Sequence, residues 1–404
     1  MRFFNSLVAL LSVSLAGVVL SSPVSLKSVE RFQGETTGKY IVKFKAGVSR
    51  RKWVNRLKSG PSAVEWDLIN GIAAVVDEDE LNELRASGDV ESITEDGIMH
   101  AWATQTNAPW GLQRITQAGA LSSTNTAFVD VRCSMYMCNS QLFSGLNYNF
   151  TYDDSAGQGV DIYIVDTGVL VTHSQFGGRA RWGTSYVGGT TDGHGHGTHC
   201  AGTAAGSQFG VAKRANIIAV QVLNSSGSGS TSGIISGLNW VLSQARASGR
   251  PSIASLSLGG SAATSLDNAV ASLTSAGVHV VVAAGNSNAN AGSYSPARAP
   301  SAITVGSSTI ADARSSFSNY GAVVDVFAPG SNVISAWIGS NTATNSISGT
   351  SMATPHVAGL AAYLISKEGN VSPAALETKI KNLSTKNALT GIPSGTANNL
   401  IRLT

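Results

Sequence analysis

The sequence predicts an α/β protein in which a large domain with a mainly parallel sheet follows a small α+β domain. After about residue 103, apolar runs of strand length alternate with helical segments and with turns rich in Gly, Ser and Ala. Such alternation is typical of a parallel sheet covered by helices on both faces. Between about residues 38 and 102 the charged residues concentrate, and shorter patterns follow one another. This change in composition and in the length of the patterns indicates two domains.

Five short patterns make up the small domain. Strands are predicted at 40–44, 66–76 and 90–95, and helices at 49–57 and 78–86. Strands and helices mixed in this way over so few residues indicate an α+β unit.

Six patterns define the expected layers of the large domain. Strands are predicted at 160–165, 217–222 and 278–284, and helices at 232–247, 265–276 and 351–365. In the first of these helices the apolar residues fall at helical spacing and predict a buried face, formed by Ile234, Ile235, Leu238, Val241 and Leu242. Pro355 is expected in the first turn of the last helix, where its missing N–H is tolerated.

The composition excludes several classes of protein. The chain has 404 residues, 43% of them hydrophobic, so it can bury a large core. A formal net charge of +3 with 13% charged residues gives no basic field for nucleic acid. We therefore expect a globular, enzyme-like protein that acts as a monomer and has no nucleic-acid partner.

The amino terminus has the pattern of a secretory signal. Arg2 precedes an apolar run at 7–20, which ends in Ser21, Ser22 and Pro23. The run is shorter than the ~20 residues that a spanning helix needs, so no membrane anchor is expected. The pattern predicts a signal peptide at 1–22 and export of the chain.

Cysteines and glycosylation triplets bear on an exported chain. Cys133, Cys138 and Cys200 allow at most one disulfide and leave a free thiol, and Cys200 is expected to be a buried small residue. Candidate glycan sites are Asn149, Asn224, Asn370 and Asn382.

Three segments supply the residue types of a nucleophilic catalytic site. Asp166 ends an apolar strand, His196 lies in a Gly-rich turn, and Ser351 lies in Gly-Thr-Ser-Met-Ala. A serine hydroxyl becomes a good nucleophile when a histidine takes its proton, and the histidine needs a carboxylate to fix its tautomer. We therefore expect Asp166, His196 and Ser351 to act together. The glycines around His196 suit the close approach of a substrate backbone.

An oxyanion site is expected beside Ser351. The helix predicted to begin there directs its positive end at the serine and leaves backbone N–H groups free in its first turn. Asn286, which follows the apolar run 278–284 and Gly285, is the candidate side-chain donor.

These segments resemble the subtilisin-like serine proteases, in particular their proteinase K group. The catalytic candidates occur in the order Asp, His, Ser, which is the subtilisin order. The stretch 351–359, Ser-Met-Ala-Thr-Pro-His-Val-Ala-Gly, is a very specific match, and 255–260 and 283–286 agree in order. The similarity covers roughly 103–365. It implies a subtilisin-like three-layer fold and a serine endopeptidase that works through an acyl-enzyme without a catalytic cofactor.

The resemblance also implies a substrate cleft. Extended protein and peptide substrates would pair as a strand between 226–229 and 257–259. The implied substrate-binding residues are Gly227, Ser257, Leu258, Gly259, Ala283 and Gly285. Small, uncharged residues there favour an apolar or aromatic substrate residue before the scissile bond.

The small domain, from Tyr40 to Phe44 onward, resembles the inhibitor-like propeptide of this family. The resemblance implies a propeptide at 23–102, with its inhibitor-like part at about 38–102, and a peptidase domain at 103–404. The chain's own propeptide would assist folding and block the cleft until self-cleavage after Trp102, give or take two residues. Secretion to the medium is expected, with delivery to a vacuole as the alternative.

A structural calcium site is a further implication of the resemblance. Asp325 aligns with the carboxylate ligand of the family's strong site, and Pro300 and Ala302 would offer backbone carbonyls. An aspartate beside a turn is more often a capping or solvated residue, so this expectation depends on the flanking match.

A stretch between Phe128 and Asn147 has no counterpart in the family pattern. Its composition changes abruptly, and removal of 129–145 joins the flanks smoothly. Our hypothesis is that 129–145 is a translated intron, and an ordinary surface insertion is the alternative.

Three alternatives to a protease remain open. His194, His196 and His199 could form a zinc cluster, although the chain has no H-E-x-x-H motif. The same fold could serve as an inactive binding or inhibitor protein, or as a hydrolase of small esters. The catalytic candidates are all present, which favours an active enzyme, and the strand-like peptide-binding segments favour a protease.

Overall fold

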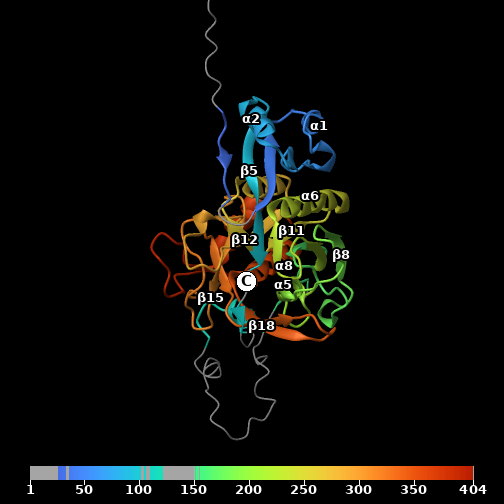
Figure 1. The fold of residues 1–404 in the computed structure, drawn as a ribbon. Coiled ribbons are helices and arrows are strands. Elements are labelled where there is room, and N and C mark those ends of the chain that lie inside the picture. Colours follow the sequence, from blue (N-terminus) through green and yellow to red (C-terminus); the bar gives the residue numbers. More distant parts are fainter. Residues whose placement is uncertain are drawn as a thin grey trace, which may run out of the picture.

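The computed structural model describes residues 26–32, 36–101, 104–105, 110–121, 150, 152–153 and 155–403. The predicted signal peptide and the stretch 129–145 lie outside these residues, as do Cys133, Cys138 and Asn149. Figure 1 shows a small body, in blue, standing on a larger one that contains the rest of the described chain.

The small body is an antiparallel sheet in the order β5-β2-β4-β3 with two helices. Its elements are β2 (Thr36–Phe44), β3 (Val64–Trp66), β4 (Gly71–Ala74), β5 (Val90–Ala101), α1 (Arg50–Val54) and α2 (Glu78–Ala86). A short β1 (Val29–Glu30) pairs in parallel with β5. Apolar side chains from the sheet and both helices form a core of their own. α2 begins where predicted because the Asp77 side chain accepts a hydrogen bond from the N–H of Glu80.

Three predicted elements of the small body were wrong in extent. The strand predicted at 66–76 is a hairpin of β3 and β4, because the chain turns between them at Asn70, which tolerates a left-handed conformation (φ +46°). The helix predicted at 49–57 ends at Val54. β5 continues to Ala101, beyond the predicted end at 95, because its last residues find partners in the large body.

The large body is built on a nine-stranded sheet in the order β19-β20-β16-β15-β13-β11-β7-β9-β8. All neighbours in it are parallel except β19 and β20. The strands are β7 (Asp161–Asp166), β8 (Ala180–Ser185), β9 (Asn216–Gln221), β11 (Ser252–Leu256), β13 (His279–Ala283), β15 (Ile303–Ser308), β16 (Val326–Pro329), β19 (Thr385–Lys386) and β20 (Asn399–Leu400). The three predicted strands correspond to β7, β9 and β13, and the mainly parallel sheet is confirmed.

Helices cover both faces of this sheet. α5 (His196–Ala205) and α8 (Thr350–Glu368) pack on one face, and α6 (Thr231–Ser248) and α7 (Thr264–Ser275) pack on the other. Alternate residues of β7 divide between the two cores, because Ile162 and Ile164 join the first while Tyr163 and Val165 join the second. The predicted three-layer α/β fold is confirmed. Within the described ranges, no helix has both the length and the apolar character to cross a membrane.

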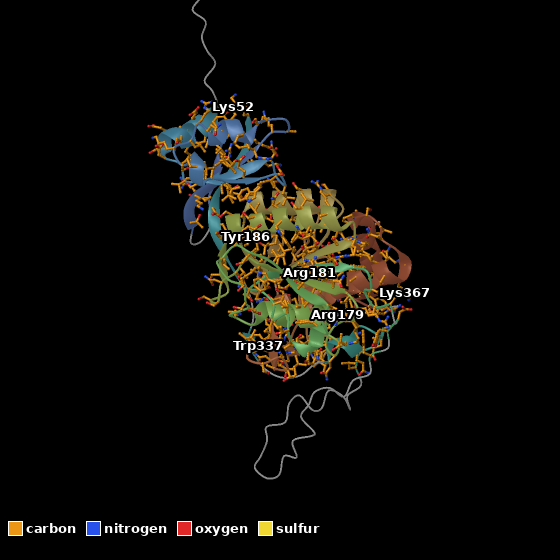
Figure 2. All side chains as sticks on the ribbon, turned by 90° about the vertical axis from the view of Figure 1, so that its right-hand side faces the viewer. Lys52, Arg179, Arg181, Tyr186, Trp337 and Lys367 are labelled. Carbon is orange, nitrogen blue, oxygen red and sulfur yellow. The ribbon has the colours of Figure 1, made fainter. Side chains whose placement is uncertain are left out.

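The small body rests on α6 of the large one (Figure 2). Ile41 and Trp66 share a core with α6 and α7, and Trp66 Nε1 donates to Ser236 Oγ on α6 at 2.7 Å. From this position β5 runs down into the large body beside β12 (Leu258–Ser261) (Figure 1). On its other edge it pairs with β10 (Ser228–Ser230). The strand therefore enters the cleft implied by the sequence.

Candidate active site

Asp166 stands at the carboxyl end of β7, in the interior of the parallel sheet, and is 1% exposed. Its Oδ1 atom accepts hydrogen bonds from the N–H of Thr167 and from Nδ1 of His196, both at 2.7 Å. The buried carboxylate therefore keeps the Nδ1 nitrogen protonated and leaves Nε2 as the nitrogen that can accept a proton.

His196 begins a helix, whereas the sequence suggested a turn. It is the first residue of α5 and follows Gly195, which is left-handed (φ +98°). Gly197 allows the helix to approach the sheet, because a Cβ there would lie 2.1 Å from the carbonyl oxygen of Gly168. This glycine serves the contact between α5 and the turn after β7, and the expected approach of a substrate backbone stays a prediction.

The surroundings of His196 suit a general base. Complete burial opposes a charge on the ring, but the Asp166 carboxylate raises the pKa of His196 well above its ordinary value of 6.5. Its Nε2 is buried and has no hydrogen-bond partner in the described part of the chain. A buried nitrogen with a raised pKa and no hydrogen-bond partner is able to accept the proton of a serine hydroxyl when a substrate is bound.

Ser351 is the second residue of α8 and is fully buried. Its Oγ donates to the carbonyl of Ser257 at 3.0 Å, and it makes no hydrogen bond to His196 in this structure. Cys200 joins the two segments, since its Sγ lies 3.9 Å from His196 Nδ1 and 3.4 Å from the Ser351 carbonyl oxygen. Rotation about the Cα–Cβ bond would release Oγ from Ser257, and catalytic hydrogen bonds commonly tighten only when substrate binds.

Pro355 lies inside α8, not in the first turn where it was predicted. Its ring removes the N–H that would bond to the carbonyl of Ser351 one turn earlier. That carbonyl accepts instead from the hydroxyl of Ser257 at 2.8 Å and from the thiol of Cys200 at 3.4 Å. Because its helical hydrogen bond is missing, the carbonyl of the candidate nucleophile is free to bond to two neighbouring segments.

Asn286 follows β13 and its side chain meets the start of α8. Its Oδ1 atom accepts from the N–H of Thr350 at 2.8 Å and from the Thr350 hydroxyl at 2.9 Å. The same hydroxyl accepts from the N–H of Gly285 at 3.1 Å. With Oδ1 held by two donors, the NH₂ group of Asn286 is the part left to donate beside Ser351.

The two segments expected to bind substrate lie on either side of β5. On one side Leu258 and Gly259 of β12 pair antiparallel with Ala101 and His100. On the other side Ser228 of β10 also pairs with His100. An extended peptide is therefore held by main-chain pairing on both of its edges.

The remaining residues of the expected cleft surround this strand. Gly227 has φ +74° and turns the chain into β10, and Ser257 leads into β12. Ala283 ends β13, and Gly285, with φ +107°, follows it toward Asn286. The structure brings the ends of β11 and β13 together at the start of α8, as a site at the carboxyl edge of a parallel sheet requires.

Asp192 is a residue of the site that the sequence reasoning missed. Its carboxylate accepts five hydrogen bonds, from Thr167 Oγ1 (2.9 Å), His194 N (3.0 Å), Gly195 N (2.8 Å), Thr198 N (3.0 Å) and Thr198 Oγ1 (2.6 Å). It therefore links the residue after Asp166 to the first turn of α5. The sequence holds little signal for this role, because the donors meet only in the folded turn.

The three neighbouring histidines do not converge on a metal position. His199 Nε2 donates to the carbonyl of Val333 at 2.9 Å, and burial lowers the pKa of His199 to about 3. Over the described ranges, the one cluster with ligand atoms close enough to hold an ion is Asp166, His196 and Cys200. The hydrogen bond between Asp166 and His196 already uses that cluster. Burial raises the pKa of the Cys200 thiol, so it stays protonated.

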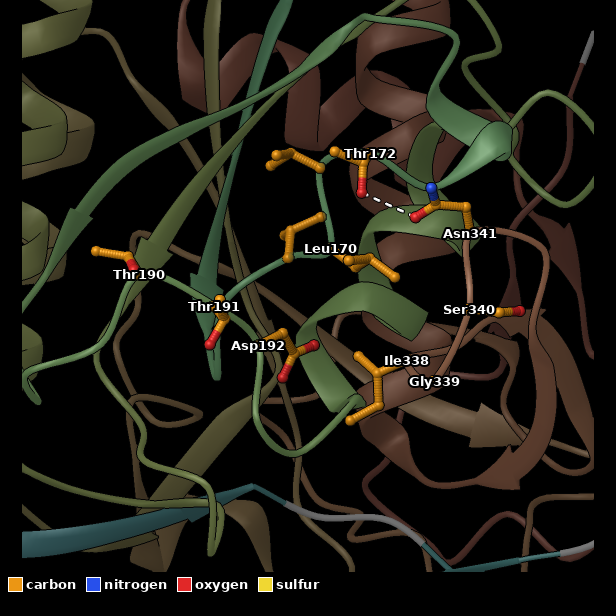
Figure 3. A pocket seen from close by; sticks show the side chains of 11 residues that line it. Leu170, Thr172, Thr190, Thr191, Asp192, Ile338, Gly339, Ser340 and Asn341 are labelled. Carbon is orange, nitrogen blue, oxygen red and sulfur yellow. Dashed lines mark hydrogen bonds between the residues drawn. The ribbon is translucent and has the colours of Figure 1, made fainter.

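A pocket of about 550 Å³ lies next to this site (Figure 3). It is lined by 169–172, 190–192 and 338–341, and Thr172 Oγ1 donates to Asn341 Oδ1 across its rim at 2.8 Å. Asp192 borders the pocket, whereas the catalytic candidates and Asn286 do not. The pocket is therefore separate from the catalytic candidates.

The three residues implied as calcium ligands lie at the edge of β15 and β16. Pro300 and Ala302 precede β15, and Asp325 precedes β16. Asp325 Oδ1 lies 2.5 Å from Nζ of Lys381, and Oδ2 accepts from the N–H of Thr304 at 2.8 Å. Both carboxylate oxygens therefore already have partners from the chain.

Comparison with known proteins identifies the family. The profile of the Subtilase family matches residues 157–398. The cuticle-degrading protease of Metarhizium anisopliae is 48% identical over 370 residues, which cover 90% of this chain and 88% of that protein. Proteinase R of Parengyodontium album is 44% identical over 372 residues, with 91% and 89% covered. The crystal structure of a cold adapted subtilisin-like serine proteinase matches with a TM-score of 0.64 and 43% identity, over 74% of this chain and 100% of that one. The chain belongs to the subtilase family and is a serine-type endopeptidase.

Proposed function

We propose that this endopeptidase is made as an exported precursor, cuts itself after Trp102 and then hydrolyses proteins through Asp166, His196 and Ser351. The observation that carries the proposal is the course of β5, which lies extended between β10 and β12. A substrate peptide would take the same path, and main-chain pairing with two edge strands tolerates many sequences.

The pairing register supports a cut after residue 102. Ala101 lies opposite Leu258 in β12, and Thr104, in β6 (Thr104–Gln105), lies opposite Ser348 in β18 (Thr344–Ser348). β18 leads through Gly349 into the helix that carries Ser351. Residues 102 and 103 lie outside the described part of the chain, and the bond between them falls between these two pairings.

The proposed chemistry is acyl transfer through the serine. Ser351 Oγ attacks the carbonyl carbon of the scissile bond, His196 Nε2 takes the hydroxyl proton, and Asp166 stabilises the resulting imidazolium. The oxyanion accepts hydrogen bonds from the Asn286 amide and from the backbone N–H of Ser351. His196 then protonates the leaving amine, and water releases the acyl group by the same steps. Chemistry of this kind needs no catalytic cofactor.

The cleft favours a broad specificity with an apolar or aromatic residue before the scissile bond. Its proposed walls are uncharged and mostly small, and they comprise Ser257, Leu258, Gly259, Ala283 and Gly285, with Gly227 at the opposite strand. The relative from Metarhizium anisopliae is named as a cuticle-degrading protease, which is in keeping with secretion of this chain. A processing protease of the vacuole is the alternative.

Two carboxylates of the small body contact helices of the large body. These contacts support the proposal that the small domain is an intramolecular inhibitor. Asp96 accepts from the N–H of Ser232 at 2.5 Å and from its hydroxyl, at the start of α6. Glu30 accepts from the N–H of Thr264 at 2.8 Å, at the start of α7, and pairs with Arg298 at 2.8 Å. Helix N-termini stabilise negative charge. The domain would thus hold the peptidase at two helices as well as in the cleft.

The proposed enzyme holds no structural calcium at Asp325, Pro300 and Ala302. The residues present do not fit an ion there, because a lysine ammonium lies 2.5 Å from the one implied carboxylate ligand. The main-chain N–H of Thr304 holds the other oxygen of that carboxylate.

The test compares the wild-type chain with Ser351→Ala. By intact mass, the wild type should be processed near Trp102. It should also digest casein, and a serine-directed fluorophosphonate should stop the digestion. Ser351→Ala should stay at full length and remain inert, because it lacks the nucleophile.

Two outcomes would count against the proposal. If both chains stay unprocessed and inactive, an inactive binding protein or an effect of 129–145 becomes the better explanation. If the wild type hydrolyses small esters and leaves casein intact, the chain is an esterase on the same fold.

A further inference from the structure

A largely buried carboxylate at the amino end of β16 is neutralised by a cation of the chain itself. Asp325 precedes β16, its side chain is 15% exposed, and its main chain is tied to its neighbours on both sides. Its N–H donates to the carbonyl of Thr304 at 3.0 Å, and its carbonyl accepts from Asn399 Nδ2 at 2.9 Å. The carboxylate therefore has a fixed position, and a fixed, poorly solvated anion needs a cation beside it.

The cation is the ammonium of Lys381 in α9 (Pro373–Leu383). Its Nζ lies 2.5 Å from Asp325 Oδ1 and 2.5 Å from Glu377 Oε1, one turn earlier on the same helix. Burial opposes the charge of Lys381, but its hydrogen bonds with Asp325 and Glu377 raise its pKa. Burial raises the pKa of Asp325, and the hydrogen bonds from Lys381 and Thr304 oppose that rise. One ammonium thus serves two carboxylates.

The fold presents this ammonium at the site. The Ser372 side chain caps α9 by accepting from the N–H of Ala375, and Leu376 and Ile380 bury one face of the helix in the main core. Because Ile380 is fixed, the next residue is held at the edge of the sheet. Lys379 on the same helix pairs instead with Glu368.

We propose that Lys381 is the resident cation of the Asp325 site, in the place where the family resemblance implied calcium. The ammonium occupies one carboxylate oxygen and the Thr304 N–H the other, so no oxygen is left without a partner. It follows that the stability of this chain does not depend on calcium through Asp325. This inference is independent of the proposed self-cleavage.

The test measures the Tm of full-length chains, all carrying Ser351→Ala so that none can process itself. Lys381→Met removes the charge and keeps the apolar stem, Asp325→Asn removes the anion, and Lys379→Met is the matched control. Each is unfolded by heat with EDTA and with millimolar calcium. In EDTA, Lys381→Met should unfold about 1 °C or more below the parent, because Asp325 loses its partner. Lys379→Met should match the parent.

The response to calcium decides which cation belongs at the site. The parent and Asp325→Asn should show the same calcium effect on Tm, since any calcium bound elsewhere acts on both. A rise in the Tm of Lys381→Met when calcium is added, absent from Lys379→Met, would indicate that ion and ammonium share one position. A larger calcium effect in the parent than in Asp325→Asn would overturn the proposal. So would a Tm of Lys381→Met equal to that of the parent in EDTA.

Discussion

In α8 the carbonyl of Ser351 lacks its backbone hydrogen bond, and two side chains of the site donate to this carbonyl instead. Pro355 cannot donate to the Ser351 carbonyl, so Ser257 and Cys200 donate to it. These contacts fix the backbone of the candidate nucleophile, whose hydroxyl donates to the Ser257 carbonyl at 3.0 Å and would have to leave it to reach His196. Ser257 thus contacts Ser351 twice, through its hydroxyl and through its carbonyl.

Replacing Ser257 with alanine tests this arrangement. The Ser351 carbonyl would keep only the weak thiol donor, so we expect a loss of about 1–2 kcal/mol in the free energy of unfolding and a fall in kcat. Ser252→Ala is the control, because its hydroxyl also donates to a carbonyl, that of Arg250 at 2.9 Å, but away from the site. Heat unfolding and peptide hydrolysis would be compared. Equal losses of kcat in both variants would contradict the role of Ser257.

The rate should depend on pH through His196. Only the neutral ring can take the serine proton, so kcat/KM should fall as the pH drops through the pKa of His196. Burial opposes the charge, but Asp166 raises that pKa above 6.5. The midpoint of the acid limb should therefore lie above pH 6.5. A pH profile of the processed enzyme with its midpoint below that value would contradict the arrangement.

The first turn of α5 places His196, and Asp192 is the residue that holds this turn. Its five hydrogen bonds reach from the residue after Asp166 to Thr198 in the helix. Asp192→Asn would set an NH₂ group against N–H donors and shift the ring. We expect kcat to fall about 10- to 100-fold through misplacement of the base, with KM nearly unchanged.

Asp161→Asn is the matched control for this prediction. Asp161 is also buried, but it lies at the opposite end of β7 and pairs with Arg250 at 2.7 Å. Its replacement should lower the Tm and leave kcat unchanged. If Asp192→Asn likewise lowered only the Tm, Asp192 would be a purely structural residue.

Among the helices and strands, the sequence predicted best those whose apolar residues repeat regularly within a single segment. α6 and β7 were found because their apolar residues face a core with a regular period. The strand predicted at 66–76 failed, because the apolar run hides a turn at Asn70. The catalytic candidates were predicted from contiguous motifs. Asp192 was missed because its partners come from two segments, Thr167 after β7 and the turn at 194–198, which meet only in the fold.

At the level of the whole molecule, the contacts between the two bodies were beyond the sequence pattern. The extension of β5 to Ala101 has its cause in β10 and β12, which lie far along the chain. Glu30 precedes the part of the chain that the sequence assigned to the inhibitor-like unit, yet it meets the start of α7. Such contacts depend on how two folded units fit together, so the periodicity of apolar residues within one segment cannot predict them.

Asp96 should set how firmly the cleaved propeptide stays bound. In Asp96→Ala the start of α6 loses its carboxylate and the Thr37 hydroxyl loses a partner, so binding should weaken by about 1–3 kcal/mol, or roughly 5- to 150-fold. After self-cleavage, casein-degrading activity should therefore appear earlier than in the wild type. Glu91→Ala is the control, because Glu91 lies on the same strand and pairs with Lys43 inside the small domain. Equal Tm values of the two variants with Ser351→Ala added would exclude a folding defect, and an unchanged delay in Asp96→Ala would mean that the helix contact adds nothing to inhibition.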